Sequence, residues 1–312
     1  MRPSLTESIR SLAGQANRRL RRTWSHLRGG ELSWLAPRDA GREEDYLAAL
    51  RQGAASDRWQ AAAALGRNPL RSPEAVAALV AALADAEEFV RMHAAEALAH
   101  QEQGHVFPAL VFALSDREPL RRAGAAEALG RLGGEAAAHT LMKHAGDPDP
   151  RVRIAVAAAL GELKDPTSAN ALVPLLHDHD GDVIRAAARA LGQIANPLAA
   201  LFLAEALAAP GQSVLVRRSL SAALVHAGHP DTQAQLLAAL RDEDPQVRGY
   251  AAQALGHFGN ETAVEPLGQL RADKHRLLRG TVSDRATQAI ELLERRGRRQ
   301  GQAGDGEPAK DN

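Results

Sequence analysis

Hydrophobic positions recur along this chain in short helical runs that repeat every 31 to 35 residues. The clearest run is DPDPRVRIAVAAALG at 147–161, in which Val152, Ala157 and Leu160 fall on one side of a helix. Equivalent runs end in an anchor residue at eight places, namely Leu65, Leu98, Leu129, Leu160, Leu191, Leu224, Leu255 and Ile290. Self-similarity at this period is typical of stacked repeats, so we expect a solenoid rather than one closed core.

Each period has room for two helices. The first helices are predicted near 44–52, 73–84, 105–115, 135–145, 167–177, 198–209, 231–241 and 261–271. The second helices are predicted near 57–67, 87–100, 118–132, 150–163, 182–195, 213–227, 245–258 and 282–296. Proline fits the first position of several of these helices, and a glycine after five of the anchors indicates a nearby helix end. No segment alternates as a strand does, so we predict an all-α fold of about eight helix pairs over 44–296.

The two ends of the chain differ from the repeats. Residues 1–28 place apolar residues at spacings of three and four, opposite a face rich in arginine with Glu7 as its single acid. This basic amphipathic helix either covers the first repeat or attaches to a partner or to an anionic membrane surface. We assign 1–43 to this helix and a linker, and 297–312 to a disordered tail.

The composition narrows the range of functions. Lys and Arg together number 38, as do Asp and Glu, so the chain lacks the overall positive charge that favours nucleic acid. It has no cysteine, which excludes disulfides and thiol catalysis. No apolar run approaches the roughly 20 residues of a membrane span. We expect a cytoplasmic protein, with peripheral attachment to a membrane through 1–28 as an alternative.

Two charged columns accompany the anchors. An arginine stands seven residues before the anchor at Arg58, Arg91, Arg122, Arg153, Arg217 and Arg248, with Arg185 displaced by one. An aspartate stands thirteen residues before it at Asp85, Asp116, Asp147, Asp178 and Asp242. We interpret the columns as a structural ladder, in which a loop carboxylate accepts guanidinium hydrogen bonds within or between neighbouring repeats. Capping of the second helix is a further predicted role of this carboxylate.

The repeats at 147–161 and 242–256 (DEDPQVRGYAAQALG) resemble the short HEAT-like repeat of phycobilisome (bilin) lyases and their relatives. The resemblance covers about 44–296. It implies a right-handed α-solenoid whose second helices line the concave side, and for most members it implies a scaffold for protein interactions. The HEAT-like enzyme deoxyhypusine hydroxylase uses His-Glu pairs for a di-iron centre, and this sequence contains no His-Glu pair.

The candidate site consists of the varying positions on the exposed side of the second helices. These residues are Trp59, Phe89, Met92, His93, Glu96, Glu127, Ile154, Arg185, Arg189, Arg218, Tyr250 and Gln253. Apolar and aromatic groups on a solvent-facing side are typical of a binding groove, and here acids come early and arginines in the middle. We therefore predict that this side binds a protein segment of mixed charge. Scattered surface variation is the competing interpretation.

The sequence shows little catalytic chemistry. The run HDHD at 177–180 is the one cluster that resembles a metal site, but adjacent turn residues point apart, so we predict no metal and no cofactor. No phosphate-binding loop, nucleophile elbow or zincin motif is present, so we predict no catalytic residues. The tryptophans all precede the main array, which disfavours nucleic acid. We predict a non-catalytic scaffold or adaptor; the alternative is a bilin-lyase-like chaperone or enzyme subunit that acts on a tetrapyrrole-carrying protein.

Overall fold

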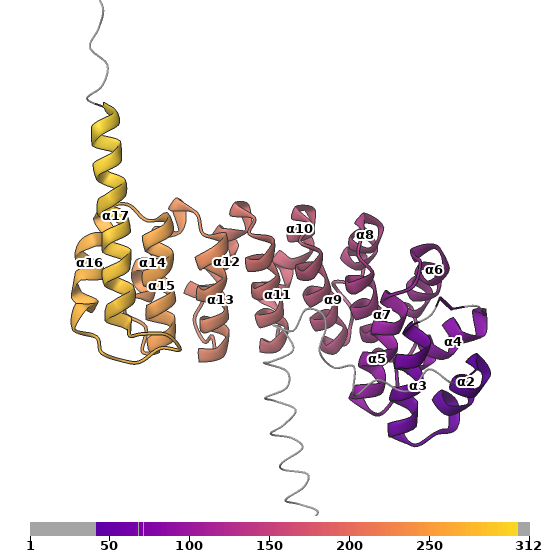
Figure 1. Cartoon of the computed structure of the whole chain (residues 1–312). Coiled ribbons are helices and arrows are strands. Elements are labelled where there is room, and N and C mark those ends of the chain that lie inside the picture. Colours follow the sequence, from indigo (N-terminus) through magenta and orange to yellow (C-terminus); the bar gives the residue numbers. More distant parts are fainter. Residues whose placement is uncertain (1–41, 68, 71, 305–312) are drawn as a thin grey trace, which may run out of the picture. The chain divides into compact units, whose positions relative to one another are not determined.

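The computed structural model describes residues 42–67, 69–70 and 72–304 of the 312-residue chain. The predicted helix at 1–28 lies outside these residues, as do nearly all of the linker and the last part of the tail. Within them the chain forms sixteen α-helices and no strand, and one isolated bridge joins Arg276 to Thr281. The predicted all-α fold is confirmed (Figure 1).

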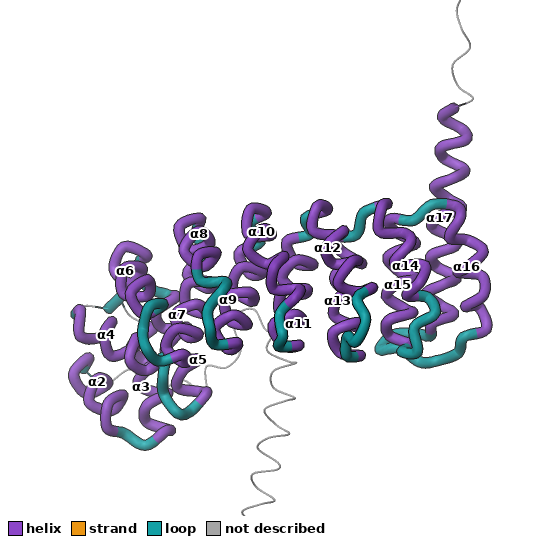
Figure 2. Tube along the Cα trace, turned by 180° about the vertical axis from the view of Figure 1, so that it is seen from behind, coloured by secondary structure: helices purple, strands orange, loops and turns teal. Residues whose placement is uncertain are grey.

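First and second helices alternate along the described array (Figures 1 and 2). The first helices are α2 (Glu43–Gln52), α4 (Pro73–Ala82), α6 (Gln103–Ala113), α8 (Glu135–Lys143), α10 (Ala169–Leu172), α12 (Pro197–Ala208), α14 (Gln233–Ala239) and α16 (Val264–Gln269). The second helices are α3 (Ala55–Arg67), α5 (Glu88–Ala99), α7 (Pro119–Leu132), α9 (Pro150–Leu163), α11 (Gly181–Ile194), α13 (Val214–Ala227), α15 (Pro245–Phe258) and α17 (Val282–Gly304). Short 3₁₀ turns extend α10, α14 and α16. The arrangement is an α-solenoid of stacked helix pairs.

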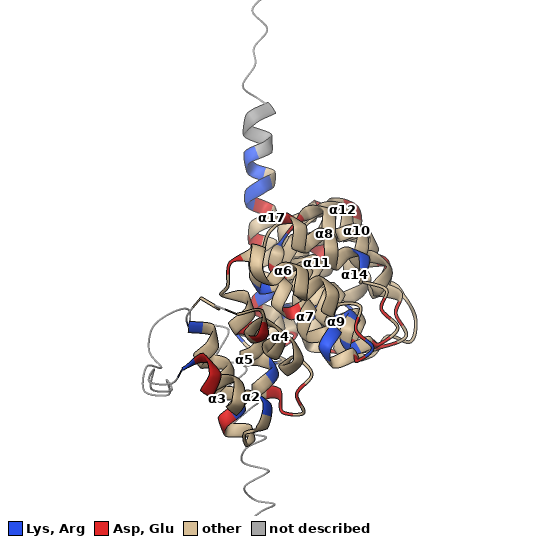
Figure 3. Ribbon diagram, turned by 90° about the vertical axis from the view of Figure 1, so that its right-hand side faces the viewer, with Lys and Arg blue, Asp and Glu red and all other residues tan. Residues whose placement is uncertain are grey.

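Helix α17 is longer than predicted. It continues past 296, where the predicted tail begins, to Gly304. Two ion pairs with the favourable i, i+4 order, Glu291–Arg295 and Glu294–Arg298, support this end of the helix, each with a separation of 3.9 Å. Figure 3 shows basic residues on the part of α17 that extends beyond its neighbours.

The core follows the repeated apolar columns. All eight anchor residues are buried, with at most 4% of their surface exposed. The valines eight residues before the anchors are equally buried, at Val90, Val152, Val183, Val216 and Val247. Between them lie alanines, whose small side chains let neighbouring helices approach closely. The predicted buried stripe of each second helix is therefore confirmed.

The glycine after the anchor has a role that differs from the predicted one. Gly161 lies inside α9, which continues to Leu163, so the glycine does not end the helix. A Cβ atom at 161 would lie 2.8 Å from Cα and 2.9 Å from Cβ of Ala190 on α11. The same close approach pairs Gly66 with Ala97, Gly130 with Ala159, Gly192 with Ala223 and Gly256 with Ala289. This glycine–alanine contact lets successive second helices pack at short range.

The arginine column links each repeat to the next. Arg153 donates from Nε and Nη2 to the two carboxylate oxygens of Asp178 in the following loop, at 2.7 and 2.8 Å. Its Nη1 donates to the carbonyls of Asp147 and Pro148 in its own loop. The same two-oxygen contact joins Arg58 to Asp85, Arg122 to Asp147 and Arg217 to Asp242. The structural interpretation of the ladder is confirmed, and its rungs cross between repeats.

The ladder aspartate does not cap the second helix, which corrects that part of the prediction. Asp178 accepts the backbone N–H of Asp180 and thereby shapes the loop. Capping falls to the second acid of the loop, because Asp180 accepts the N–H of Asp182 at the start of α11. The equivalent caps are Asp149 on α9 and Asp244 on α15.

One rung was absent from the predicted columns. Arg248 donates from Nε to Oδ2 of Asp273 at 2.8 Å. Asp273 follows its arginine by 25 residues, as in the rungs of Arg122, Arg153 and Arg217, but an insertion displaces it from the offset to the last anchor.

The joint between α5 and α7 lacks both the glycine–alanine contact and the arginine–aspartate rung. Ala99 stands where five other repeats have the glycine, and Arg91 donates only to the carbonyls of Asp85 and Ala86 in its own loop. Asp116, the carboxylate that Arg91 would reach, instead accepts from Arg121 at 2.7 Å. Accordingly, α5 and α7 pack less closely than any other neighbouring pair of second helices in the described array.

Gly130→Ala is expected to lower the free energy of unfolding by roughly 1–3 kcal/mol, because its new methyl group would overlap Ala159. The ideal Cβ position at 130 lies 2.6 Å from Cβ of Ala159. Urea unfolding followed by circular dichroism measures the change. Gly268→Ala in α16 is the matched control, since no atom lies within 4 Å of its Cβ position. Equal unfolding midpoints for the two variants would contradict the role of the glycine–alanine contact.

Arg153→Ala is expected to lower the free energy of unfolding by about 2–3 kcal/mol, because it leaves a nearly buried carboxylate without its charged donor. The side chain of Asp178 is only 10% exposed. Arg91→Ala is the control, since Arg91 occupies the same column and bonds its own loop carbonyls without a carboxylate across the joint. Urea unfolding should show a clearly smaller loss for the control. A loss as large as that of Arg153→Ala would mean that the cross-repeat bond contributes little.

Acid is expected to remove the contribution of this rung. Burial opposes the charge on Asp178, yet hydrogen bonds from Arg153 and the N–H of Asp180 hold its pKa below the ordinary value. A pKa lowered by folding contributes stability that is complete above the unfolded-state value of about 4 and is lost as the pH falls below it. Urea titrations of wild type and Arg153→Ala should therefore converge as the pH is lowered from about 5 to 2. A constant difference would exclude ionised Asp178 as its source.

Candidate partner-binding face

The predicted site residues all belong to the second helices, and the structure distributes them over seven consecutive ones. We call this exposed side of α3 to α15 the second-helix face. Its predicted members are Trp59 on α3, Phe89, Met92, His93 and Glu96 on α5, Glu127 on α7, Ile154 on α9, Arg185 and Arg189 on α11, Arg218 on α13, and Tyr250 and Gln253 on α15. The residues thus follow one row of stacked helices, but they are not all equally available.

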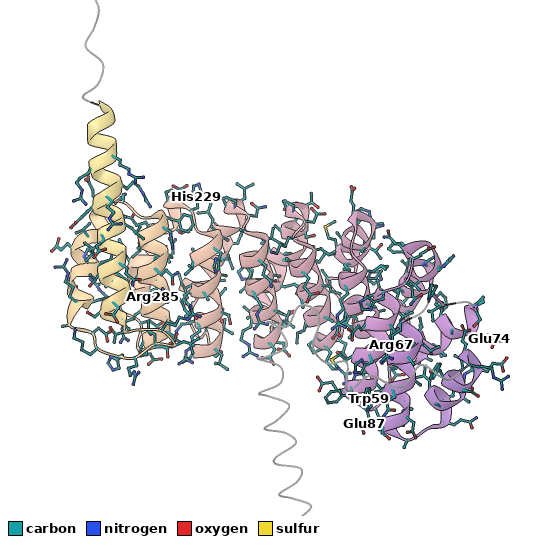
Figure 4. All side chains as sticks on the ribbon, viewed as in Figure 1. Trp59, Arg67, Glu74, Glu87, His229 and Arg285 are labelled. Atoms are coloured by element: carbon teal, nitrogen blue, oxygen red, sulfur yellow. The ribbon has the colours of Figure 1, made fainter. Side chains whose placement is uncertain are left out.

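An aromatic cluster occupies the α3–α5 end of the face. The rings of Trp59 and His93 stack across the joint, with centroids 5.2 Å apart and planes inclined by 27°. Nδ1 of His93 lies 3.5 Å from Oε2 of Glu96. Phe89, on the same helix, keeps 46% of its surface exposed. Figure 4 labels Trp59 on α3.

Glu96 is held in its charged form. The hydrogen bond with His93 lowers the pKa of Glu96, burial opposes this, and the charges of His93, Arg131 and His100 add to the lowering. Arg131 on α7 also donates to the carbonyl of Met92 on α5 at 3.5 Å. Arg131 stands two residues after the anchor Leu129, outside the varying positions from which the site was predicted.

The middle of the face contains one available arginine. Arg189 is exposed and has no carboxylate partner among the described residues. Arg185 instead donates to Oδ1 of Asp182 at 2.6 Å. Between these residues and the aromatic cluster, Glu127 is exposed, whereas Ile154 is half-buried and packs against the core.

Arg218, predicted as a partner-binding residue, forms an ion pair with the loop that precedes α15. Its Nε and Nη2 donate to the two carboxylate oxygens of Asp244, at 2.9 and 2.5 Å. Asp244 caps α15, and the hydrogen bond with Arg218 lowers its pKa against the opposing effect of burial. Tyr250 and Gln253 on α15 are half-buried, and Tyr250 packs against the core. The predicted site residues on α13 and α15 therefore mostly contact other parts of this chain.

The run at 177–180 is also used structurally, since Asp178 accepts from Arg153 and Asp180 caps α11. Across the described ranges, no group of three or more His, Cys, Asp or Glu side chains is arranged to hold a metal ion. No helix in the part of the chain that the structure describes is both long and apolar enough to span a bilayer.

Comparisons with known proteins bear on the repeats. The family model for HEAT repeats matches residues 140–222 and 202–294. The model for the PBS lyase HEAT-like repeat matches 121–147. No curated protein sequence matches the chain.

Solved structures share the architecture. YibA of Escherichia coli is 20% identical with a TM-score of 0.58, over 86% of this chain and 99% of that chain. The karyopherin Kap121p, bound to the extreme C-terminus of the protein phosphatase Cdc14p, is 15% identical with a TM-score of 0.60, over 82% of this chain and 33% of that chain. The complex of CpcE and CpcF of phycocyanin lyase from Nostoc sp. is 24% identical over 86% of this chain and 100% of that chain, but the TM-score is only 0.37. The first two likenesses show the fold alone.

The family assignment rests on agreement between pattern, fold and family models. The two models together match the chain from 121 to 294, where helix pairs with buried anchors recur. The chain therefore belongs to the HEAT-repeat proteins, and its segment 121–147 matches the PBS lyase HEAT-like repeat.

Proposed function

We propose that this chain is a non-catalytic scaffold or adaptor that binds an extended segment of another protein along the second-helix face. HEAT repeats commonly bind protein partners, and the Kap121p complex with a C-terminal protein segment is consistent with this use of the fold. The observation that carries the proposal is the exposed Phe89, four residues before His93 of the Trp59–His93 stack. It is followed along the same row by Arg189, which has no carboxylate partner in the part of the chain that the structure describes.

The contacts of each residue refine which side chains would bind. Trp, Tyr and Arg dominate interface hot spots because they bury large areas and fix orientation. The aromatic cluster would receive an apolar side chain of the partner, with Glu96 and Glu127 favouring a cation beside it. Arg189 would pair with an acid further along the segment. Arg185 and Arg218 would contribute less, because both already bond carboxylates of this chain.

Attachment through the basic residues of 1–28 remains a separate prediction, because that segment lies outside the described residues. A cytoplasmic location likewise remains a prediction. Neither affects the argument for the second-helix face, which rests only on residues of α3 to α15.

Crosslinking is expected to place a partner on this face. The chain has no cysteine, so a single cysteine can carry a photoreactive label at a chosen site. Labels at Gln60 and Ala158, exposed neighbours of the proposed contacts, should crosslink to one common protein from an extract of the source cells. A label at Phe112, which is 77% exposed on the first helix α6, should not.

The same crosslinking assay tests which side chains contribute to partner binding. Phe89→Ala and Arg189→Glu should each weaken capture about tenfold, the size of a moderate hot spot. Phe112→Ala, a matched exposed phenylalanine, should leave capture unchanged. Unchanged capture by the first two variants, or equal crosslinking from 112, would reject the proposed face.

The alternative function, a bilin-lyase-like subunit, is favoured by the PBS lyase repeat model that matches 121–147. A change in absorbance on mixing the purified chain with a free tetrapyrrole would support this alternative over a scaffold that does not bind chromophore.

A further inference from the structure

The loop between α16 and α17 is rich in cations, whereas five equivalent loops carry paired acids. The equivalent loops before α5, α7, α9, α11 and α15 carry paired acids at Asp85 and Glu87, Asp116 and Glu118, Asp147 and Asp149, Asp178 and Asp180, and Asp242 and Asp244. In residues 270–281, which we call the basic loop, four cations accompany the single acid Asp273. The cations are Arg271, Lys274, Arg276 and Arg279, and all four are exposed. Figures 1 and 2 show this long loop at the lower edge of the array, beside α15.

The basic loop has a defined conformation. Asp273 accepts from Arg248 on α15, and the N–H of Leu277 donates to the carbonyl of Gly280 at 2.9 Å. The loop is also tied to α17, because Ser283 donates from Oγ to the carbonyl of Arg271 at 2.7 Å. Leu277 packs over Gly249, where a Cβ atom would lie 2.6 Å from its Cδ1. These contacts hold the loop in one shape against the last repeat.

This shape presents an apolar residue among the cations. Leu278 is 91% exposed, the highest value among the large hydrophobic residues of the described chain. No carboxylate of the described residues forms an ion pair with Lys274, Arg276 or Arg279. The pKa of Asp284 is lowered chiefly by its hydrogen bonds with Thr281, and the charge of Lys274 contributes least to this lowering. Figure 4 labels Arg285, a further cation at the start of α17.

A cationic loop with a projecting leucine fits an anionic lipid surface better than other polyanions. Phosphates of a nucleic acid or acids of a peptide would satisfy the cations, but they would leave Leu278 in water. A bilayer supplies anionic headgroups and, just beneath them, an apolar phase for the leucine. We propose that the basic loop docks on anionic phospholipid, with Lys274, Arg276 and Arg279 on headgroup phosphates and Leu278 inserted between the lipids. This surface is distinct from the second-helix face and from residues 1–28.

Residues 1–28 could themselves bind anionic vesicles, so the test needs a signal from the basic loop itself. A dye at position 278 supplies that signal. The full chain is labelled at Leu278→Cys with an environment-sensitive dye, which is specific because the native chain has no cysteine. Vesicles of phosphatidylcholine with phosphatidylserine should shift its emission to the blue, and phosphatidylcholine alone should not. Leu198→Cys, a leucine 77% exposed on α12, is the matched control and should not respond.

Sedimentation with the same vesicles measures the contribution to binding. The variant Lys274→Gln/Arg276→Gln/Arg279→Gln should lower the partition coefficient at least tenfold, since each cation near an anionic surface contributes roughly fivefold. Leu278→Ala should lower it by about tenfold. Arg117→Gln/Lys143→Gln/Arg241→Gln removes equally exposed cations from other repeats and should change it by no more than about twofold.

Several results would overturn the proposal. A dye at 278 that does not respond to anionic vesicles would reject it, even if the chain sediments with them through 1–28. Binding of a short RNA or an acidic peptide that is lost in the glutamine variant, with vesicle binding unchanged in Leu278→Ala, would make the loop a general polyanion site. A shift of the dye with protein concentration alone would indicate a second copy of the chain instead.

Discussion

The contact between successive second helices is the interaction on which this structure depends. A stacked array has no closed core, so each repeat is stabilised only by its neighbours. Two devices act at these joints, the glycine–alanine contact within the helices and the arginine–aspartate rung at their loop ends. The α7–α9 and α9–α11 joints have both, through Gly130 and Arg122 in one and Gly161 and Arg153 in the other. The α3–α5 and α15–α17 joints also have both, through Gly66 and Arg58 in one and Gly256 and Arg248 in the other.

Where one device is missing, the other is retained or reinforced. The α11–α13 joint has Ile184 in place of the ladder arginine and keeps the approach of Gly192 to Ala223. The α13–α15 joint has Val225 in place of the glycine, and two arginines, Arg217 and Arg218, reach acids of the next loop. The ion pair of Arg218 therefore has a structural explanation. A joint that cannot pack at the shortest range is held by an additional charged contact.

The sequence predicted the elements well because periodicity averages over eight copies of one unit, so helix positions do not depend on any single residue. It predicted the partners less well. Counting back from the anchors found five ladder aspartates and missed Asp273, whereas counting 25 residues forward from Arg248 would have found it. The glycine column was misinterpreted for a different reason, since a helix end and a close approach both favour glycine and only the neighbouring alanine distinguishes them. Helix α17 exceeded its predicted end because spaced ion pairs oppose the helix-breaking effect of Gly297.

For the candidate site, periodicity assigned residues to a face but could not show which were already occupied. Arg185, Arg189 and Arg218 look alike in the columns, yet only Arg189 lacks a nearby carboxylate among the described residues. The difference depends on acids elsewhere, three residues before Arg185 and 26 residues after Arg218. Such pairings are properties of the stacked array and not of one helix.

The α5–α7 joint connects stability with the proposed function. It lacks both structural devices, and it also carries Met92, Glu96 and Arg131 of the second-helix face. Residues that build a joint already bond this chain, as Arg218 does, so a joint with fewer such bonds leaves more of its side chains available. A protein segment that crossed from α5 to α7 would add contacts where the chain itself supplies fewest. Binding there would stiffen this joint more than any other, because a local opening with a low free-energy cost gains most from added contacts.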